Sequence, residues 1–177
     1  MFSLNHALKP QREAGSLNQQ INRELASAYV YLAMSAWADE QNLNGAASWL
    51  RLQWQEELVH ATKLVDYIAQ RGGRLELKAI AKPPMKYKSL LDCFRAVLHH
   101  EEEVTVAINE LYDAAAKEKD YATQTLLDWY VNEQVEEENA PAEIISMLEL
   151  AGDSPSGLLI VDRQLASRTT TTGAAPA

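Results

Sequence analysis

Apolar residues recur every three or four positions over four long segments of the chain. The first segment runs from Pro10, a residue favoured in the first turn of a helix, to about Gln41. Its apolar positions include Leu17, Ile21, Leu25, Ala28 and Leu32. This pattern predicts a long amphipathic helix with one buried face.

Residues that favour turns divide the rest of the chain into three further long segments and one short one. The long segments run from NLNG (42–45) to about Arg71, from Ser89 to about Glu118, and from KEKD (117–120) to about Ala151. Gly72 and Gly73 are typical of a helix end, and Ser89 is a typical N-cap. LLIVDRQLAS (158–167) predicts a short fifth helix. We expect residues 168–177, which include TTTTGAAPA, to form a disordered tail.

The lengths of the connections predict how these helices are arranged. Two short turns would make antiparallel pairs, the first helix with the second and the third with the fourth. Residues 73–88 form a 16-residue connection that can extend to roughly 50 Å, about the length of one helix. This connection can cross along the bundle, so that the second and third helices run parallel. The predicted fold class is all-α: a four-helix bundle with a long crossover and a short fifth helix.

Composition and charge exclude several classes of function. The chain has 177 residues, of which 47% are apolar and 23% charged, as is typical of a globular protein. Its net charge of −9 argues against a nucleic-acid partner and suits cations. The single Cys93 excludes a disulfide within the chain and a multi-cysteine metal site. Because we find no signal peptide and no apolar run of 18 residues, we expect a cytoplasmic protein without a membrane partner.

Polar residues suited to metal binding occur at matched positions in the four long segments. They are Glu24, Glu57, His60, Glu101, Gln134 and Glu137. Glu24 and Glu57 are 33 positions apart, as are Glu101 and Gln134. In each antiparallel pair, the polar residues lie at equal distances from the turn. We therefore expect the four helices to point these side chains at one another near the middle of the bundle.

A bound cation would explain such a cluster. Buried carboxylates repel one another and are poorly solvated, so a cation is needed to make their proximity tolerable. Oxygen ligands with one imidazole and no thiolate suit iron or manganese. Two metal ions fit better than one, because a shared carboxylate can bridge them. Di-iron bundles carry two single Glu and two Glu-x-x-His, and here Gln134-x-x-Glu137 replaces the second Glu-x-x-His.

Each element has a simpler interpretation when it is taken alone. A single Glu-x-x-His is common by chance, and the acidic stretches at 99–104 and 133–139 are each typical of a solvated helix face. Tyr31 lies two helical turns after Glu24 on the same face, and it is either a core residue or part of the site. The four elements at matched heights together favour a metal site.

The sequence resembles the bacterial non-haem ferritins from about Leu8 to Ser167. The stretches that carry this resemblance are INRELASAYVYLAMSAW, GAASWLRLQWQEELVHATKLVDYI, HHEEEVTVAINEL and LLDWYVNEQVEEEN. The resemblance implies a ferritin-like di-iron domain over residues 1–167 and a shell of twenty-four subunits around ferric mineral. It also implies ferroxidase activity, with Fe(II) and dioxygen or peroxide as substrates. No haem is implied, because Leu58 stands where bacterioferritins have a haem-ligating Met.

The resemblance implies a role for each candidate residue. Glu24, Glu57 and His60 would hold the first iron. Glu57 would bridge to a second iron held by Glu101 and Glu137, with Gln134 beside it. The ligands of a third iron nearby would be Glu56, Glu133, Glu136 and Glu137. Tyr31 matches a tyrosine thought to supply an electron during oxygen reduction.

Some alternatives stay open at the level of sequence. Gln124 and Leu127 replace the acidic residues that line the threefold channel of animal ferritins, and Asp120 or Asp128 could substitute for them. A di-iron oxidase acting on an organic substrate would use the same centre without a mineral store. A helical scaffold without catalysis would need no metal.

Overall fold

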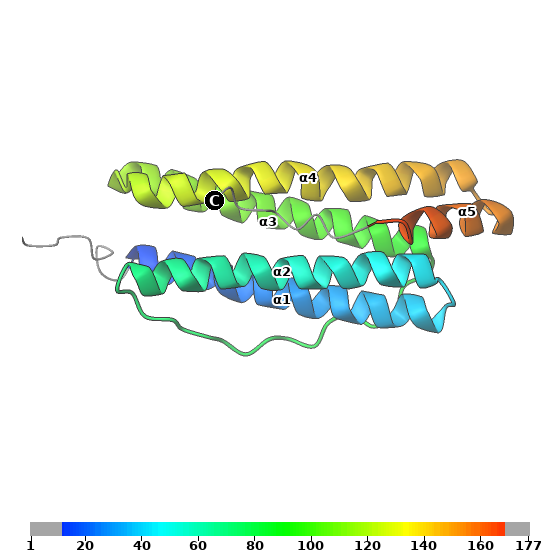
Figure 1. Cartoon of the computed structure of the whole chain (residues 1–177), viewed down its shortest axis with the longest axis horizontal. Coiled ribbons are helices and arrows are strands. Elements are labelled where there is room, and N and C mark those ends of the chain that lie inside the picture. The colour runs from blue at the N-terminus through cyan, green and yellow to red at the C-terminus, as the bar shows by residue number, and fades with distance from the viewer. Residues whose placement is uncertain (1–11, 169–177) are drawn as a thin grey trace, which may run out of the picture.

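The four long amphipathic segments form four long helices, and a short fifth helix follows them (Figure 1). This computed structural model describes residues 12–168. The helices are α1 (Arg12–Glu40), α2 (Asn44–Gln70), α3 (Leu90–Glu118), α4 (Tyr121–Ala151) and α5 (Pro155–Leu165). The predicted all-α bundle is confirmed, and residues 12–168 contain no β-strand. Within this range no helix has the length and apolar character needed to cross a membrane.

The crossover between α2 and α3 runs along the outside of the α1–α2 pair, as Figure 1 shows. Two asparagines of α1 anchor it. Asn18 donates a hydrogen bond to the carbonyl oxygen of Arg74 at 2.8 Å and accepts one from the backbone N–H of Glu76 at 2.7 Å. Asn22 donates to the carbonyl of Glu76 at 2.8 Å and accepts from the N–H of Lys78 at 2.7 Å. These side chains satisfy backbone groups of a segment that has no regular partner.

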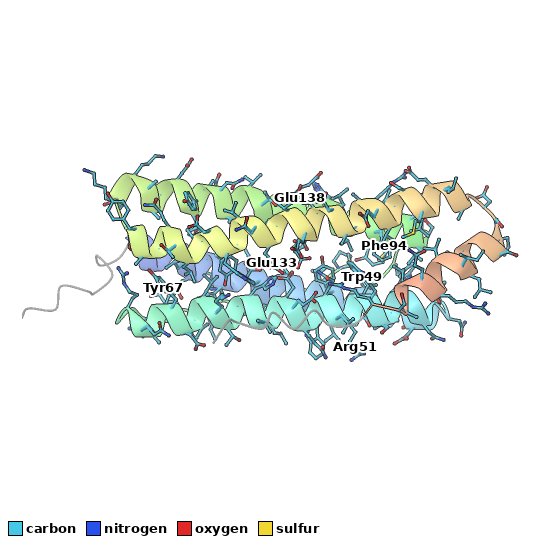
Figure 2. The ribbon with its side chains drawn as sticks, turned by 45° about the horizontal axis from the view of Figure 1, so that its top comes forward. Trp49, Arg51, Tyr67, Phe94, Glu133 and Glu138 are labelled. Atoms are coloured by element: carbon cyan, nitrogen blue, oxygen red, sulfur yellow. The ribbon has the colours of Figure 1, made fainter. Side chains whose placement is uncertain are left out.

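Two apolar clusters fill the two ends of the bundle. One surrounds Trp49 and Phe94, whose rings lie 5.2 Å apart near the α5 end (Figure 2). The other contains Leu17, Leu64 and Leu127 and fills the opposite end. On each long helix, the buried glutamates, with His60 and Gln134, fall between the stretches that supply these two clusters. The bundle therefore has a polar layer in the middle, held between two apolar layers.

Helix α5 begins earlier than the sequence predicts, at Pro155 rather than at residue 158. Ser154 caps it by accepting a hydrogen bond from the N–H of Gly157, and Pro155 fits the first turn. Asp162 of α5 in turn accepts hydrogen bonds from the N–H groups of Gly45, at 3.2 Å, and Ala46, at 2.8 Å. A Cβ on Gly45 would lie 1.7 Å from the Asp162 carbonyl oxygen, so only glycine allows this contact. Helix α5 is thereby fixed to the beginning of α2.

Most other predicted boundaries agree with the structure to within about two residues. Ser89 caps α3, as predicted, by accepting a hydrogen bond from the N–H of Asp92. The prediction that a helix starts at Pro10 and the predicted tail from residue 169 onward lie outside the described residues. Arg168 differs from its predicted place in a disordered tail, because its side chain packs against α2.

Candidate metal centre

Six polar side chains that the sequence predicts to meet are buried in the middle layer of the bundle. Their exposed fractions are Glu24 1%, Glu57 2%, His60 4%, Glu101 1%, Gln134 4% and Glu137 6%. They come from all four long helices, and the crossover places the two antiparallel pairs at the same level. Their burial rules out the alternative that these acidic positions form only a solvated helix face.

Glu24, Glu57 and His60 form a group that can hold one metal ion. Their ligand atoms all lie within 4.8 Å of one another. Gln20 orients Glu24 by donating a hydrogen bond to its Oε1 at 2.8 Å, and Tyr130 donates to the His60 carbonyl oxygen at 2.7 Å. With both carboxylates ionised, Glu24 Oε2 and Glu57 Oε2 have no hydrogen-bond partner. Unsatisfied buried oxygens are rare, and a bound cation would satisfy both.

A second group lies on the other side of His60. The ligand atoms of His60, Glu133 and Glu137 lie within 4.8 Å of one another, and His60 Nε2 is 4.0 Å from Glu133 Oε1. Figure 2 shows Glu133 on α4, midway along the bundle. Glu133 is partly exposed, with 30% of its side chain accessible. This group therefore connects the buried centre to the surface between α2 and α4.

Glu101 is held by two hydrogen-bond donors. Tyr31 donates its hydroxyl to Glu101 Oε1, and Gln134 Nε2 lies 3.4 Å from Glu101 Oε2. Gln134 also donates to the Glu101 carbonyl at 3.3 Å and to the Thr105 hydroxyl at 3.2 Å. Among the described residues, Glu101 belongs to neither three-ligand group. Tyr31 is fully buried and is also a hydrogen-bond partner of the site, so both interpretations of this residue apply.

Burial and mutual repulsion raise the pKa of the central carboxyls. Burial raises the pKa of Glu57 well above its usual range, and the charges of Glu24, Glu101 and Glu137 add to this. Burial also raises the pKa of Glu137, and it raises that of Glu101 to about 7. The carboxyls of Glu24 and Glu57 are close enough to share a proton. The metal-free cluster thus holds protons that a cation would displace.

The imidazole of His60 is neutral at neutral pH. Burial lowers its pKa to about 4, and the nearby Lys63 charge adds to this effect. Its Nδ1 lies 3.8 Å from Glu57 Oε2, but a neutral ring makes no ion pair there. Neutral imidazole is the form that binds metal ions.

The residues predicted for a third iron are less buried than the others. Glu56 is partly exposed and accepts a hydrogen bond from Arg168 Nη2 at 2.7 Å, and Glu136 is exposed. Neither belongs to a three-ligand group among the described residues. The structure therefore brings Glu133 and Glu137 together and leaves Glu56 paired with an arginine.

Several residues around the site were missed by sequence reasoning. They are Gln20, Gln53, Tyr130 and Arg168. Gln20 and Gln53 each precede a central glutamate by four positions, one helical turn, and this repeated spacing was a usable signal. Arg168 follows the last helix, and no local pattern marks where its side chain lies.

The structure also shows the contacts of residues near the candidate site and of two residues considered for the entry channel. Trp129 packs its ring edge-on to His60, at 5.3 Å between centroids, and Lys63 Nζ lies 3.5 Å from the Trp129 ring. Leu127 is buried in an apolar cluster. Asp120 caps α4 and forms an ion pair with Arg71 at 3.3 Å, so its carboxylate already takes part in structural contacts.

The chain is similar to known proteins over most of its length. The family model described as a ferritin-like domain matches residues 14–151. A bacterial non-heme ferritin of Escherichia coli O6:H1 is 41% identical over 160 residues, covering 90% of this chain and 96% of that protein. The Campylobacter jejuni protein of the same name is 39% identical over 149 residues, covering 84% and 89%. An open-pore ferritin from Archaeoglobus fulgidus superposes with a TM-score of 0.90 at 44% identity, covering 92% of this chain and 100% of that chain.

Proposed function

This chain belongs to the ferritin family, and from that premise we propose that it stores iron and has ferroxidase activity. It oxidises Fe(II) at paired sites inside the bundle and deposits ferric oxyhydroxide within a shell of 24 cytoplasmic subunits. One observation supports this above the others: carboxylate oxygens of Glu24 and Glu57 are buried within 4.8 Å of each other and of a ring nitrogen of the neutral His60. Such oxygens suit a divalent cation.

In the proposed reaction, the central side chains bind two Fe(II) ions as substrate. Glu24, Glu57 and His60 hold the first iron, and Glu57 bridges to the second. Glu101 and Glu137 hold the second iron, with Gln134 beside it. The two irons together supply two electrons to dioxygen or peroxide. Carboxylate ligands favour Fe(III) over Fe(II), which lowers the barrier to electron release.

Two further features extend this proposal. Tyr31 donates a hydrogen bond to Glu101 Oε1, so a phenol that can supply an electron contacts a proposed ligand directly. Glu133, Glu136 and Glu137, with Glu56, supply a third position on the α2–α4 side. A position that is partly exposed suits iron on its way between the buried pair and the solvent. The ferric product hydrolyses and collects as mineral in the cavity of the shell.

Two variants test this proposal. We expect Glu57→Ala and His60→Ala each to abolish rapid Fe(II) oxidation, because each removes a ligand of the first iron. Stopped-flow absorbance after mixing with oxygenated buffer measures the oxidation rate. Size-exclusion chromatography should show a very large particle for the wild type and for both variants. Rapid oxidation that persists in both variants would contradict the assignment, and a monomer or dimer would favour an oxidase without storage.

A further inference from the structure

Arg168, the last described residue, contacts three side chains on one face of α2: Trp49, Gln53 and Glu56. Its guanidinium carbon is 4.6 Å from the centre of the Trp49 ring. Its Nη1 donates a hydrogen bond to Gln53 Oε1, and its Nη2 donates to Glu56 Oε2 at 2.7 Å. Positions 49, 53 and 56 are spaced by one helical turn each, so they share a face. An aromatic ring, an amide and a carboxylate together match the preferences of a guanidinium.

Gln53 also connects Arg168 to a central carboxylate. The side chain of Gln53 is fully buried, and its Nε2 donates to Glu137 Oε2 at 2.5 Å. Because a guanidinium can only donate, its hydrogen bond fixes the amide oxygen of Gln53 toward Arg168. The amide nitrogen must then face Glu137. Arg168 thus contacts Glu56 directly and orients Glu137 through Gln53.

The docking of α5 fixes where Arg168 can reach. Asp162 ties α5 to the first N–H groups of α2, and Val161 and Leu165 are buried against the bundle. The backbone N–H of Arg168 donates to the Leu165 carbonyl oxygen at 3.2 Å. The fold therefore holds the guanidinium at Glu56, and only 24% of the Arg168 side chain is exposed.

We propose that Arg168 is a positioning residue for the outer metal position, which is the third iron position of Glu56, Glu133, Glu136 and Glu137. Its guanidinium binds Glu56 in place of a metal ion, and a metal ion must displace it before Glu56 can act as a ligand. This inference rests on the proposed function, because it concerns the third iron position. While Arg168 donates to Glu56 Oε2, that oxygen has less electron density to offer a metal ion, and the guanidinium charge repels an arriving cation. Arg168 therefore weakens metal binding at the outer position and makes the buried positions fill first.

The electrostatics of Glu56 agree with this role. Burial raises the pKa of Glu56, and the Arg168 charge and hydrogen bond oppose that rise. Arg168 also acts against the rise in the pKa of Glu137. It thus offsets part of the repulsion among these carboxylates when no metal is bound.

Zinc binding to the metal-free full chain tests the proposal, because Zn²⁺ binds such ligands and is not oxidised. Isothermal titration calorimetry would give the number of zinc ions per chain and their affinities for wild type, Arg168→Gln and Arg168→Lys. Arg163→Gln is the matched control, since Arg163 lies exposed on α5 and its loss changes the net charge equally. Glu56→Gln should abolish the outer binding event and thereby identify it. Circular dichroism melting confirms that each variant is folded.

We expect Arg168→Gln to bind the outer zinc on the order of 10- to 100-fold more tightly than wild type, the equivalent of one charge-assisted hydrogen bond. Arg163→Gln should match wild type, and Arg168→Lys, which keeps the charge but loses the fork of donors, should fall between. Unchanged or weaker outer binding in Arg168→Gln overturns the inference, as does the absence of an outer event in every variant. If wild type bound no zinc at the buried positions, that result would instead overturn the proposed function.

Discussion

The Glu101→Gln substitution is expected to make the metal-free protein more stable at neutral pH. Burial raises the pKa of Glu101 from its usual 4.5 to about 7. The stability that the protonated Glu101 side chain contributes is therefore complete below pH 4.5 and is lost as the pH rises through about 7. At about 1.4 kcal/mol per pKa unit, the loss near pH 7.5 is about 3 kcal/mol. Glutamine carries no charge and can still accept the hydrogen bond from Tyr31.

Thermal unfolding with a chelator at fixed chain concentration measures this effect. For a chain of this size, about 3 kcal/mol corresponds to a melting temperature roughly 6–12 °C higher for the variant at pH 7.5. The difference should shrink to less than about 1 kcal/mol at pH 5, where Glu101 is mostly protonated in the folded chain. Saturating Zn²⁺ should reverse the order, because wild type gains a ligand that the variant lacks.

Glu102→Gln is the matched control for this experiment. Glu102 is the next residue on α3 and its side chain is 57% exposed, so the same charge is removed from a solvated position. We expect its stability to stay within about 0.5 kcal/mol of wild type at both pH values. A Glu101→Gln variant that is less stable than wild type at pH 7.5, or equally shifted at both pH values, would show that burial of the Glu101 charge does not limit stability.

Two other substitutions test the contacts that position the site. Asn22→Ala removes both hydrogen bonds to the crossover and should cost about 1–2 kcal/mol, and hydrogen exchange at the Lys78 amide should accelerate. Unchanged exchange at Lys78 would show that these bonds do not anchor the crossover. Gly45→Ala places a Cβ against the Asp162 carbonyl, so we expect a loss of about 1–3 kcal/mol in thermal unfolding and faster exchange at the Ala46 amide. A melting temperature and exchange rate equal to wild type would contradict the tight contact.

The helices and their meeting point could be predicted because both depend on regular spacing. Helical periodicity and turn residues locate α1 to α4, and equal distances from the turns place Glu24 opposite Glu57, and Glu101 opposite Gln134. Burial then follows from the apolar residues on the same face.

Contacts that join distant parts of the chain could not be predicted in the same way. Arg168 and Glu56 are 112 positions apart, and no periodic pattern relates them. Helix α5 starts before residue 158 because Ser154 acts as its cap and Pro155 as its first helical residue, and apolar periodicity alone does not reveal either role. The hydrogen bond between Tyr31 and Glu101 follows from side-chain orientation, which spacing leaves open.

In the proposed function, carboxylates from four helices hold two metal ions in the middle of the bundle. Anomalous diffraction from crystals soaked anaerobically with Fe(II) tests it most directly. We expect two iron peaks per chain, one between Glu24, Glu57 and His60 and the other between Glu57, Glu101 and Glu137. Iron bound only at exposed carboxylates, or no iron in the bundle at all, would contradict it.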